Sequence, residues 1–432
     1  MWGVDRVARR QVAVCVLGVA LIAGGQGFHL ESDVVEAATT PPVAQQVAEE
    51  SAPTPPAAVK SAFPAGKPCG DIAEAPPGVS SQPTTSYLTK NLAKVKTLKA
   101  LRVYSCVDMW PGFGTQTILS KGSLIQVHAV HSAQDGTPRL SVSGGYISAS
   151  VADVARPTLT IPKAREVYAF DVDTGEVLYQ KNANKATSVA SLAKLMTALI
   201  VRDEVAAGRL TWDTKISITD PNLVRMSTDW NTGGRPLKVG QTFTLKQLDT
   251  LSVVSSHNAA VTQIGIYISG NNAKFVRKMN AKAAKLGMTK STFISVSGLD
   301  TKDLDRFGLK IPGTQGGNQV SAKDMATLTA ALLKADPGLT TLTKKSSVKV
   351  KGKKARSTNQ LLEGFPFYKP SLGVDGLKTG YTGSAGYCLV ATAKPSGRHR
   401  VAVVIVHAKN SKNRFEGASK LLESIYARYP LS

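Results

Sequence analysis

The sequence predicts an α+β fold in which an antiparallel sheet is covered by helices and joined to a helical lobe. From Lys163 onward, strand-like runs stand at both ends of the region and helical patterns lie between them. The first two strand-like runs flank Asp173-Thr-Gly175, which is a strong signal for a β-hairpin. This arrangement of strands and helices favours a layered α+β domain.

Each expected element follows from its hydrophobic spacing. A helix over residues 191–207 repeats Leu, Met and Ile at helical spacing and stops at Gly208. Another helix begins at Ser321, because Ser321-x-x-Asp324 reads as a capping box. The other expected strands are 167–172, 177–179, 387–392 and 401–406, and the other expected helices are 244–254, 258–268, 271–286 and 411–426.

Three further segments are expected ahead of this region. Residues 1–37 carry three arginines before a short apolar run, which is typical of a signal peptide, with an uncleaved N-terminal anchor as the alternative. Residues 38–68 form a Pro/Ala-rich linker. Residues 69–155 hold short β-prone runs, at 100–104, 123–130, 139–142 and 145–148, separated by glycine turns as in a small all-β barrel-like module. The α+β domain is expected over 160–432. The chain is therefore expected to be extracytoplasmic.

Charge and cysteine content limit the possible partners. A formal net charge of +23 favours an anionic surface, such as cell-wall polymer or lipid headgroups, although a solvated basic face explains it equally well. Nucleic acid is not expected, since no reader motif accompanies the charge. Cys69 and Cys106 are candidates for a disulfide, and Cys388 reads as a buried, inert thiol. No Cys/His cluster has zinc spacing, so neither metal nor cofactor is expected.

Ser191 and Lys194 are the first candidate catalytic residues. They stand three residues apart at a helix start, so their side chains share a face. A lysine that burial holds neutral can remove the proton of a serine and make it a nucleophile. A second Ser-x-x-Lys, Ser346 to Lys349, lies in a charged run with strand-like alternation, where the lysine stays solvated and protonated.

Ser256-His257-Asn258 forms a polar turn between two apolar helical segments. In a catalytic interpretation, Ser256 relays protons to the leaving group and Asn258 bonds Lys194 and a substrate amide. His257 is interpreted as structural. The alternative is that Ser256 and Asn258 only break and cap helices. A second Ser-x-Asn, at residues 357–359, is set aside on its placement.

Lys378-Thr379-Gly380 is expected on a strand edge, where the lysine and threonine hold a carboxylate by charge and hydroxyl. Gly380 lets a substrate backbone lie against the strand. The N–H groups of Ser191 and Tyr381 are then expected to form an oxyanion hole.

These three motifs, within Ala190-Ser-Leu-Ala-Lys-Leu-Met-Thr-Ala198, Ser256-His-Asn-Ala-Ala260 and Val374-Asp-Gly-Leu-Lys-Thr-Gly380, resemble low-molecular-mass penicillin-binding proteins over about residues 163–429. The resemblance is closest to the serine D-alanyl-D-alanine carboxypeptidases. It implies a β-lactamase/transpeptidase-like fold and removal of the terminal D-Ala from peptidoglycan stem pentapeptides through an acyl-enzyme. β-Lactam antibiotics would be covalent inhibitors. Many relatives carry Asn-Asp-Ala where this chain has Asn258-Ala-Ala260.

Several alternatives remain beside this interpretation. A D,D-endopeptidase acting on cross-links would use identical chemistry, and a non-catalytic cell-wall-binding protein would use only the N-terminal module and the charge. That module, through residues 119–127 and 145–150, resembles bacterial Src-homology-3-type wall-binding domains. A class A β-lactamase is not expected, because the required Glu-x-x-Leu-Asn is missing and Glu363 is the only glutamate between Asn258 and Lys378.

Overall fold

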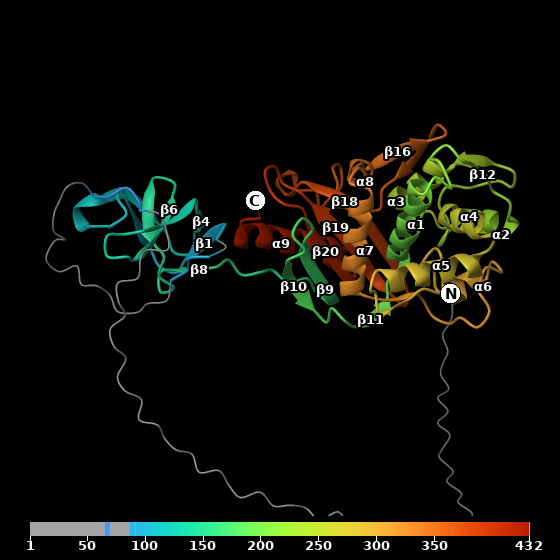
Figure 1. Ribbon diagram of the computed structural model, residues 1–432, viewed down its shortest axis with the longest axis horizontal. Coiled ribbons are helices and arrows are strands. Elements are labelled where there is room, and N and C mark those ends of the chain that lie inside the picture. Colours follow the sequence, from blue (N-terminus) through green and yellow to red (C-terminus); the bar gives the residue numbers. More distant parts are fainter. Residues whose placement is uncertain (1–64, 70–86, 91, 432) are drawn as a thin grey trace, which may run out of the picture. The chain divides into compact units, whose positions relative to one another are not determined.

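The computed structural model describes residues 65–69, 87–90 and 92–431 (Figure 1). The expected signal peptide, 1–37, and nearly all of the expected linker, 38–68, lie outside these residues. Among the described residues, no helix is both long and apolar enough to span a membrane.

Residues 92–155 form two antiparallel sheets, with one 3-10 turn at Pro111–Phe113. One sheet has the order β3-β2-β7-β6-β5 and the other the order β4-β1-β8. The bounds are β1 Lys94–Thr97, β2 Leu101–Tyr104, β3 Gly114–Leu119, β4 Leu124–Gln126, β5 Ala129–Ser132, β6 Pro138–Val142, β7 Gly145–Ser148 and β8 Val154–Ala155. Their shared core includes Val95, Val103, Leu140 and Ile147, all without exposed surface.

The expected all-β character of this segment is confirmed, but the barrel-like closure was wrong. The run over residues 123–130, expected as one strand, is divided between β4 and β5, which pair with β1 and β6 respectively. Because these strands belong to different sheets, the module is two open sheets. A disulfide joins Cys69 to Cys106 beside the buried Trp110.

The remaining residues are built on a five-stranded antiparallel sheet of order β10-β9-β20-β19-β18. Its strands are β9 Ala164–Asp171, β10 Val177–Lys181, β18 Val374–Thr382, β19 Gly386–Ala393 and β20 Val401–Ala408. Helix α7 (Ala322–Ala335) packs on one face with α1, and α9 (Ser411–Arg428) packs on the other (Figure 1). The inner strands are apolar on both faces because helices cover both. Strand β18 lies at the edge of the sheet, and this position matters for the site.

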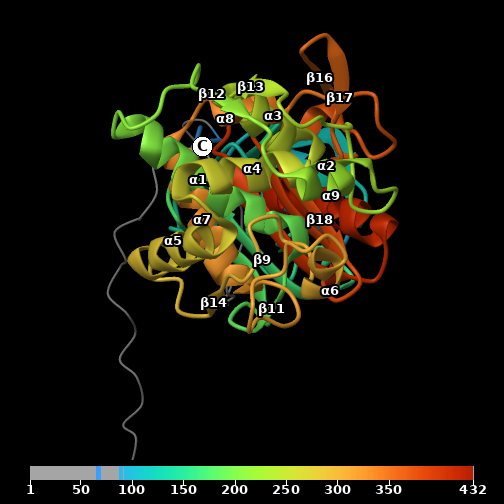
Figure 2. The ribbon, with the colours of Figure 1, turned by 90° about the vertical axis from the view of Figure 1, so that its right-hand side faces the viewer.

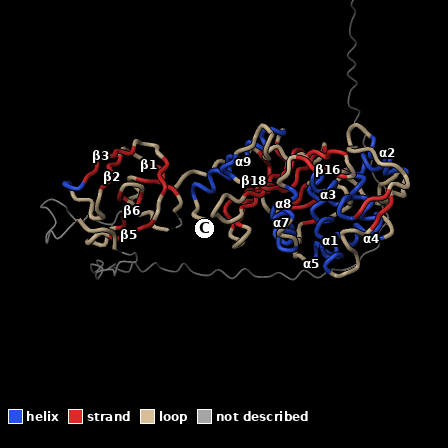
Figure 3. Tube along the Cα trace, turned by 90° about the horizontal axis from the view of Figure 1, so that it is seen from above, coloured by secondary structure: helices blue, strands red, loops and turns tan. Residues whose placement is uncertain are grey.

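The helices between β11 and β18 form a lobe to one side of the sheet (Figures 2 and 3). The helices are α1 Lys194–Ala206, α2 Pro221–Thr228, α3 Leu245–Ser255, α4 Asn258–Ser269, α5 Asn272–Lys285, α6 Thr301–Asp305 and α8 Leu339–Thr343. The short strands of this part are β11 Ala186–Ser188, β12 Lys215–Ser217, β13 Thr242–Thr244, β14 Ser291–Thr292, β15 Gln319–Ser321, β16 Ser347–Val350 and β17 Lys353–Arg356.

The helices expected from hydrophobic spacing are present, with one difference of boundary. Residues 190–193 form a 3-10 helix, so the α-helix begins at Lys194 and not at Ser191. The capping box expected at Ser321 is seen in part, since its hydroxyl accepts from the N–H of Asp324. Asp324 instead accepts from Lys290 and Ser291 and ties β14 to α7.

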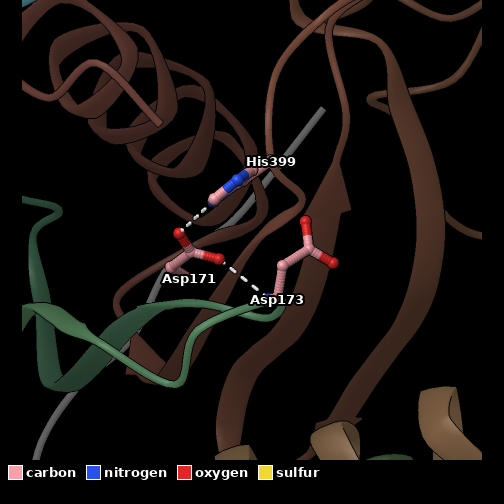
Figure 4. A group of neighbouring side chains, drawn as sticks. All are labelled: Asp171, Asp173 and His399. Carbon is pink, nitrogen blue, oxygen red and sulfur yellow. Dashed lines mark hydrogen bonds and ion pairs between the residues drawn. The ribbon is translucent and has the colours of Figure 1, made fainter. Parts of the chain in front are cut away.

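The β9–β10 hairpin, which the sequence predicted, is held by Asp171, Asp173 and His399 (Figure 4). Asp171 accepts from the N–H groups of residues 173 and 174 and pairs with His399 Nδ1 at 2.7 Å. Burial opposes the charge of Asp171, but these hydrogen bonds outweigh it and lower its pKa. Asp173 accepts from the N–H of Arg400. Donors within the chain therefore occupy oxygens of both carboxylates. The three side chains connect the hairpin to the loop before β20.

Candidate active site

Ser191 lies in the 3-10 helix Ala190–Ala193, directly before α1. Ala190 has a φ of +50°, in the left-handed region that residues with a Cβ atom rarely adopt. Gly298 packs so closely here that a Cβ atom on it would lie 2.1 Å from the carbonyl oxygen of Ala190. Ser191 itself is only half-buried. The strained turn at Ala190, held in place by the close packing of Gly298, therefore keeps Ser191 accessible.

Lys194 is fully buried, and three oxygen atoms surround its Nζ. The distances are 2.6 Å to Ser191 Oγ, 2.7 Å to Asn258 Oδ1 and 2.6 Å to the carbonyl oxygen of Ser297. Burial, and then the charge of Lys378, lower the pKa of Lys194 well below its ordinary value. A neutral amine has two N–H bonds, and the two carbonyl oxygens can only accept. Its lone pair is therefore left facing the hydroxyl of Ser191.

Asn258, in the first turn of α4, joins Lys194 to the loop over residues 229–235. Its Oδ1 accepts from Lys194, and its Nδ2 donates to the carbonyl oxygen of Thr232 at 2.7 Å. Asp229 folds this loop by accepting the N–H groups of residues 231 and 232. At the tip of the loop Trp230 is 92% exposed. The amide orientation of Asn258 is thus determined by a donor on one side and an acceptor on the other.

His257 has a structural position, as the sequence analysis interpreted it. Its Nδ1 accepts from the N–H of Ala260, so it caps α4, and its Nε2 donates to the carbonyl oxygen of Arg235 at 2.7 Å. Burial lowers the pKa of His257 to about 4, which keeps the ring neutral. The ring therefore holds the 229–235 loop in place, away from Ser191.

Lys378 is almost fully buried on β18, and its Nζ donates to the carbonyl oxygen of Thr379 at 2.7 Å. Burial, and then the charge of Arg414, lower the pKa of Lys378 to about 7. The hydroxyl of Thr379 lies 2.5 Å from that of Thr358. Lys378 is also close enough to Lys194 to lower the latter's pKa, so the third motif faces the first.

Gly380 lets strand β18 approach the Ser191 segment. A Cβ atom at this position would lie 2.9 Å from the carbonyl oxygen of Val189 and 3.1 Å from the backbone nitrogen of Ser191. Any larger residue would push the strand away from the nucleophile. Close packing within the chain is thus a second reason for a glycine here, beside the expected approach of a substrate backbone, which stays a prediction. The guanidinium of Arg414, from α9, fixes the strand by donating to the carbonyl oxygen of Gly380.

The structure brings Ser191, Lys194 and Asn258 into direct contact and places Gly380 beside them. Ser256 ends α3 in the left-handed conformation with a φ of +60°, and no hydrogen bond of its hydroxyl is found in the described part of the chain. Tyr381 is 55% exposed. Four residues of the site were not expected from the sequence: Ser297, Thr232, Thr358 and Arg414. Gly298, next to Ser297, and Gly233, next to Thr232, are the signals of close backbone packing that the sequence offered.

The two duplicate motifs differ in their surroundings. Lys349 is exposed on β16, as expected of the second Ser-x-x-Lys. The second Ser-x-Asn is not a surface feature: both Ser357 and Asn359 are buried. Asn359 Nδ2 donates to the carbonyl oxygen of Gly376 at 3.0 Å, so the second Ser-x-Asn helps to hold strand β18 in position.

Comparison with known proteins agrees with this geometry. The D-alanyl-D-alanine carboxypeptidase family matches residues 153–410, more than half of the chain. The chain belongs to this family. Residues 87–152 match a separate family, a domain of unknown function.

The chain is similar to D-alanyl-D-alanine carboxypeptidase DacF of Bacillus subtilis, with 31% identity over 62% of this chain and 63% of the relative. It thus spans less than two thirds of that relative's length. Among solved structures, the peptidoglycan synthesis regulatory factor PBP3 of Streptococcus pneumoniae has 32% identity and a TM-score of 0.58 over 61% of this chain and 74% of its own. Ampicillin-bound penicillin-binding protein D2 of Listeria monocytogenes has 33% identity and a TM-score of 0.52 over 62% of this chain and 100% of its own. The fold class is the α+β one expected.

Proposed function

We propose that the chain is a serine D-alanyl-D-alanine carboxypeptidase that removes the terminal D-Ala from peptidoglycan stem pentapeptides. The observation that carries the proposal is the 2.6 Å contact between the buried Lys194 amine and Ser191 Oγ, with Asn258 and Ser297 occupying the other bonds of the amine. This arrangement supplies a nucleophile and a base without a histidine or a metal ion.

The reaction is expected to proceed in two steps. Lys194 takes the proton of Ser191 as Oγ attacks the carbonyl carbon of the penultimate D-Ala, and the N–H groups of Ser191 and Tyr381 stabilise the oxyanion. The C–N bond then breaks, and the proton passes to the departing amine of the terminal D-Ala, with Ser256 as the relay. Water finally attacks the ester while Lys194 accepts its proton. The ester bond then breaks, Lys194 returns that proton to Ser191 Oγ, and the shortened peptide leaves.

Lys378 and Thr379 are proposed to hold the terminal carboxylate of the substrate. An opposite charge beside a buried lysine favours its protonated form, so substrate binding should raise the lowered pKa of Lys378. The same arrangement would bind the carboxylate of a penicillin, and Ser191 would open its β-lactam ring to give a stable acyl-enzyme. The ampicillin-bound Listeria structure supports this assignment.

The deciding experiment is mass spectrometry of D-Ala release from a pentapeptide, with and without penicillin. Wild type should release one D-Ala per peptide and lose this activity after penicillin treatment. Ser191→Ala should be inactive, whereas the matched variant Ser346→Ala, in the duplicate motif, should behave as wild type. Absence of D-Ala release by wild type would contradict the proposal, and splitting of a cross-linked dimer into monomers without release of D-Ala would assign endopeptidase activity instead.

We also propose that the protein acts outside the cytoplasm, secreted or associated with the wall or membrane. The support is the arginine-led apolar segment within residues 1–37 and the net charge of +23, which favours anionic wall polymer or lipid headgroups. Residues 69–155 are proposed as the wall-binding module. Sedimentation of this module with purified cell walls at rising salt checks the role, and no retention at low salt would reduce it to a spacer.

A further inference from the structure

A basic hollow lies beyond the end of the Lys378-Thr379-Gly380 motif. Its volume is about 540 Å³, and its lining includes Lys163, Arg165, Lys181, His407, Lys409 and Tyr381. These residues come from the start of β9, the end of β10 and the end of β20, far apart in sequence. Tyr381 directly follows Gly380, so the hollow adjoins the candidate active site.

The cations of this hollow are available to a ligand. Lys163, Arg165, Lys181 and Lys409 are all exposed. Within the part of the chain that the structure describes, none of the four pairs with a carboxylate, and Lys181 donates only to the carbonyl oxygen of residue 164. Other lysines of the domain behave differently, for example Lys278, whose Nζ lies 2.6 Å from a carboxylate oxygen of Glu204.

One acidic side chain, Glu166, lies near these cations. It has no exposed surface, and neither of its carboxylate oxygens has a hydrogen-bond partner. Burial raises its pKa, although the charges of Lys185, Arg165 and Lys181 act against this shift. A further cation approaches from the lobe, since Lys302 Nζ would lie 3.8 Å from a Cβ atom on Gly383, another lining residue.

The direction of the edge strand leads a bound peptide toward this hollow. Strand β18 has a partner on one side only, so an extended peptide can lie along its free edge. With its terminal carboxylate at Lys378 and its scissile carbonyl at Tyr381, the peptide runs antiparallel to β18. The residues that precede D-Ala-D-Ala then pass Gly383, roughly 7 Å further at about 3.3 Å per residue. Gly383 is itself a lining residue, so these peptide residues reach the rim of the hollow, whose cations lie further across the same end of the sheet, at β9, β10 and β20.

We propose that this hollow is a subsite for free carboxylates on the peptide residues that precede D-Ala-D-Ala. The proposal rests on the proposed function and deepens it, because it makes the enzyme selective for acidic stem peptides. Exposed ion pairs are individually weak, so the expected preference for an acidic over an amidated peptide is about three- to tenfold in kcat/KM.

The test compares acetyl-Glu-Glu-D-Ala-D-Ala with acetyl-Gln-Gln-D-Ala-D-Ala, which differ only in side-chain carboxylates. Wild type should prefer the acidic peptide, and Arg165→Ala/Lys409→Ala should remove that preference while hydrolysis of the amidated peptide is unchanged. Lys274→Ala/Lys285→Ala, which removes the same charge from exposed sites on α5, should keep the preference. Arg165→Lys/Lys409→Arg should keep it as well.

The subsite would be overturned if Lys274→Ala/Lys285→Ala (the α5 variant) lost the preference for the acidic peptide as much as Arg165→Ala/Lys409→Ala (the hollow variant). It would also be overturned if the hollow variant kept that preference undiminished. Calorimetric binding of both peptides to Ser191→Ala separates the subsite from the reaction. If wild type hydrolyses neither peptide, the proposed function is wrong. The subsite is then supported if Ser191→Ala binds the acidic peptide more tightly than the amidated one, and it is overturned if the two bind equally. If the hollow variant loses only binding of a polyphosphate probe and keeps the peptide preference, the hollow serves a phosphate polymer and the proposal is wrong.

Discussion

Ser191 to Lys194 and Ser346 to Lys349 share the same residue pattern but differ in every property that catalysis needs. Lys194 is buried, contacts three oxygen atoms and has a strongly lowered pKa, whereas Lys349 is exposed on a two-stranded hairpin. The difference teaches that burial and the positions of neighbouring acceptors, and not the residue types, give Lys194 the lowered pKa that the proposed role as a base requires.

Replacing each lysine by methionine gives the largest expected contrast. Lys194→Met keeps the length and burial of the side chain but removes the base, so acylation by a fluorescent penicillin should slow about a thousandfold. Lys349→Met should acylate at the wild-type rate. Stopped-flow measurement of the second-order acylation rate checks both. A Lys194→Met rate within a few fold of wild type would show that another group takes the serine proton.

Asn258→Asp makes Lys194 more like Lys349 by favouring its charged form. A carboxylate at 2.7 Å in place of the amide oxygen favours the charged amine and therefore raises the pKa of Lys194. Acylation at pH 7 should therefore fall about tenfold or more, and the pH–rate profile should move to higher pH. A slower variant whose profile keeps the wild-type midpoint would contradict the role of Asn258 as a neutral acceptor.

Lys378→Met tests whether the second buried lysine costs stability. Burial lowers the pKa of Lys378 to about 7, against an unfolded value of about 10.4. Between these values the unfolded chain binds more protons, so stability should rise with pH from about 7 to about 10. Removing the amine should flatten this rise and stabilise the protein at pH 6 by about 1–4 kcal/mol.

Thermal melts from pH 6 to 10 measure this effect, and D-Ala release should fall in the same variant because the carboxylate partner is lost. Lys353→Met, on the exposed hairpin, is the control and should change neither quantity. A Lys378→Met protein that is less stable than wild type at pH 6 would show that the amine is a net stabilising group.

Much of the fold was predictable because long apolar periods dominate it. Strands β9, β10, β19 and β20 and helices α1, α3, α4, α5, α7 and α9 all correspond to expected elements. Of the short strands β11–β17, only β16 was indicated, by the alternation around residues 346–349, since two to four residues otherwise carry no measurable period. The N-terminal module was misjudged at residues 123–130, where hydrogen-bond partners far along the chain decide which sheet each strand joins.

The site could be predicted where a short motif carries the side chains. Ser191, Lys194 and Asn258 were found in this way. The carbonyl oxygens of Ser297 and Thr232 were missed, because a backbone acceptor leaves no trace in residue type.

Thr358 and Arg414 were missed because each contacts β18 from a distant part of the sequence. The burial of Ser357 and Asn359 could not be read from the sequence for the same reason, since it depends on their packing against β18.

The most direct test of the account is peptide mapping by mass spectrometry after reaction with benzylpenicillin. The account predicts one penicilloyl adduct per chain on the peptide that contains Ser191, no adduct in Ser191→Ala, and an unaltered adduct in Ser346→Ala. An adduct at another serine, or no adduct on the wild-type protein, would contradict the assignment of Ser191 and Lys194 as nucleophile and base.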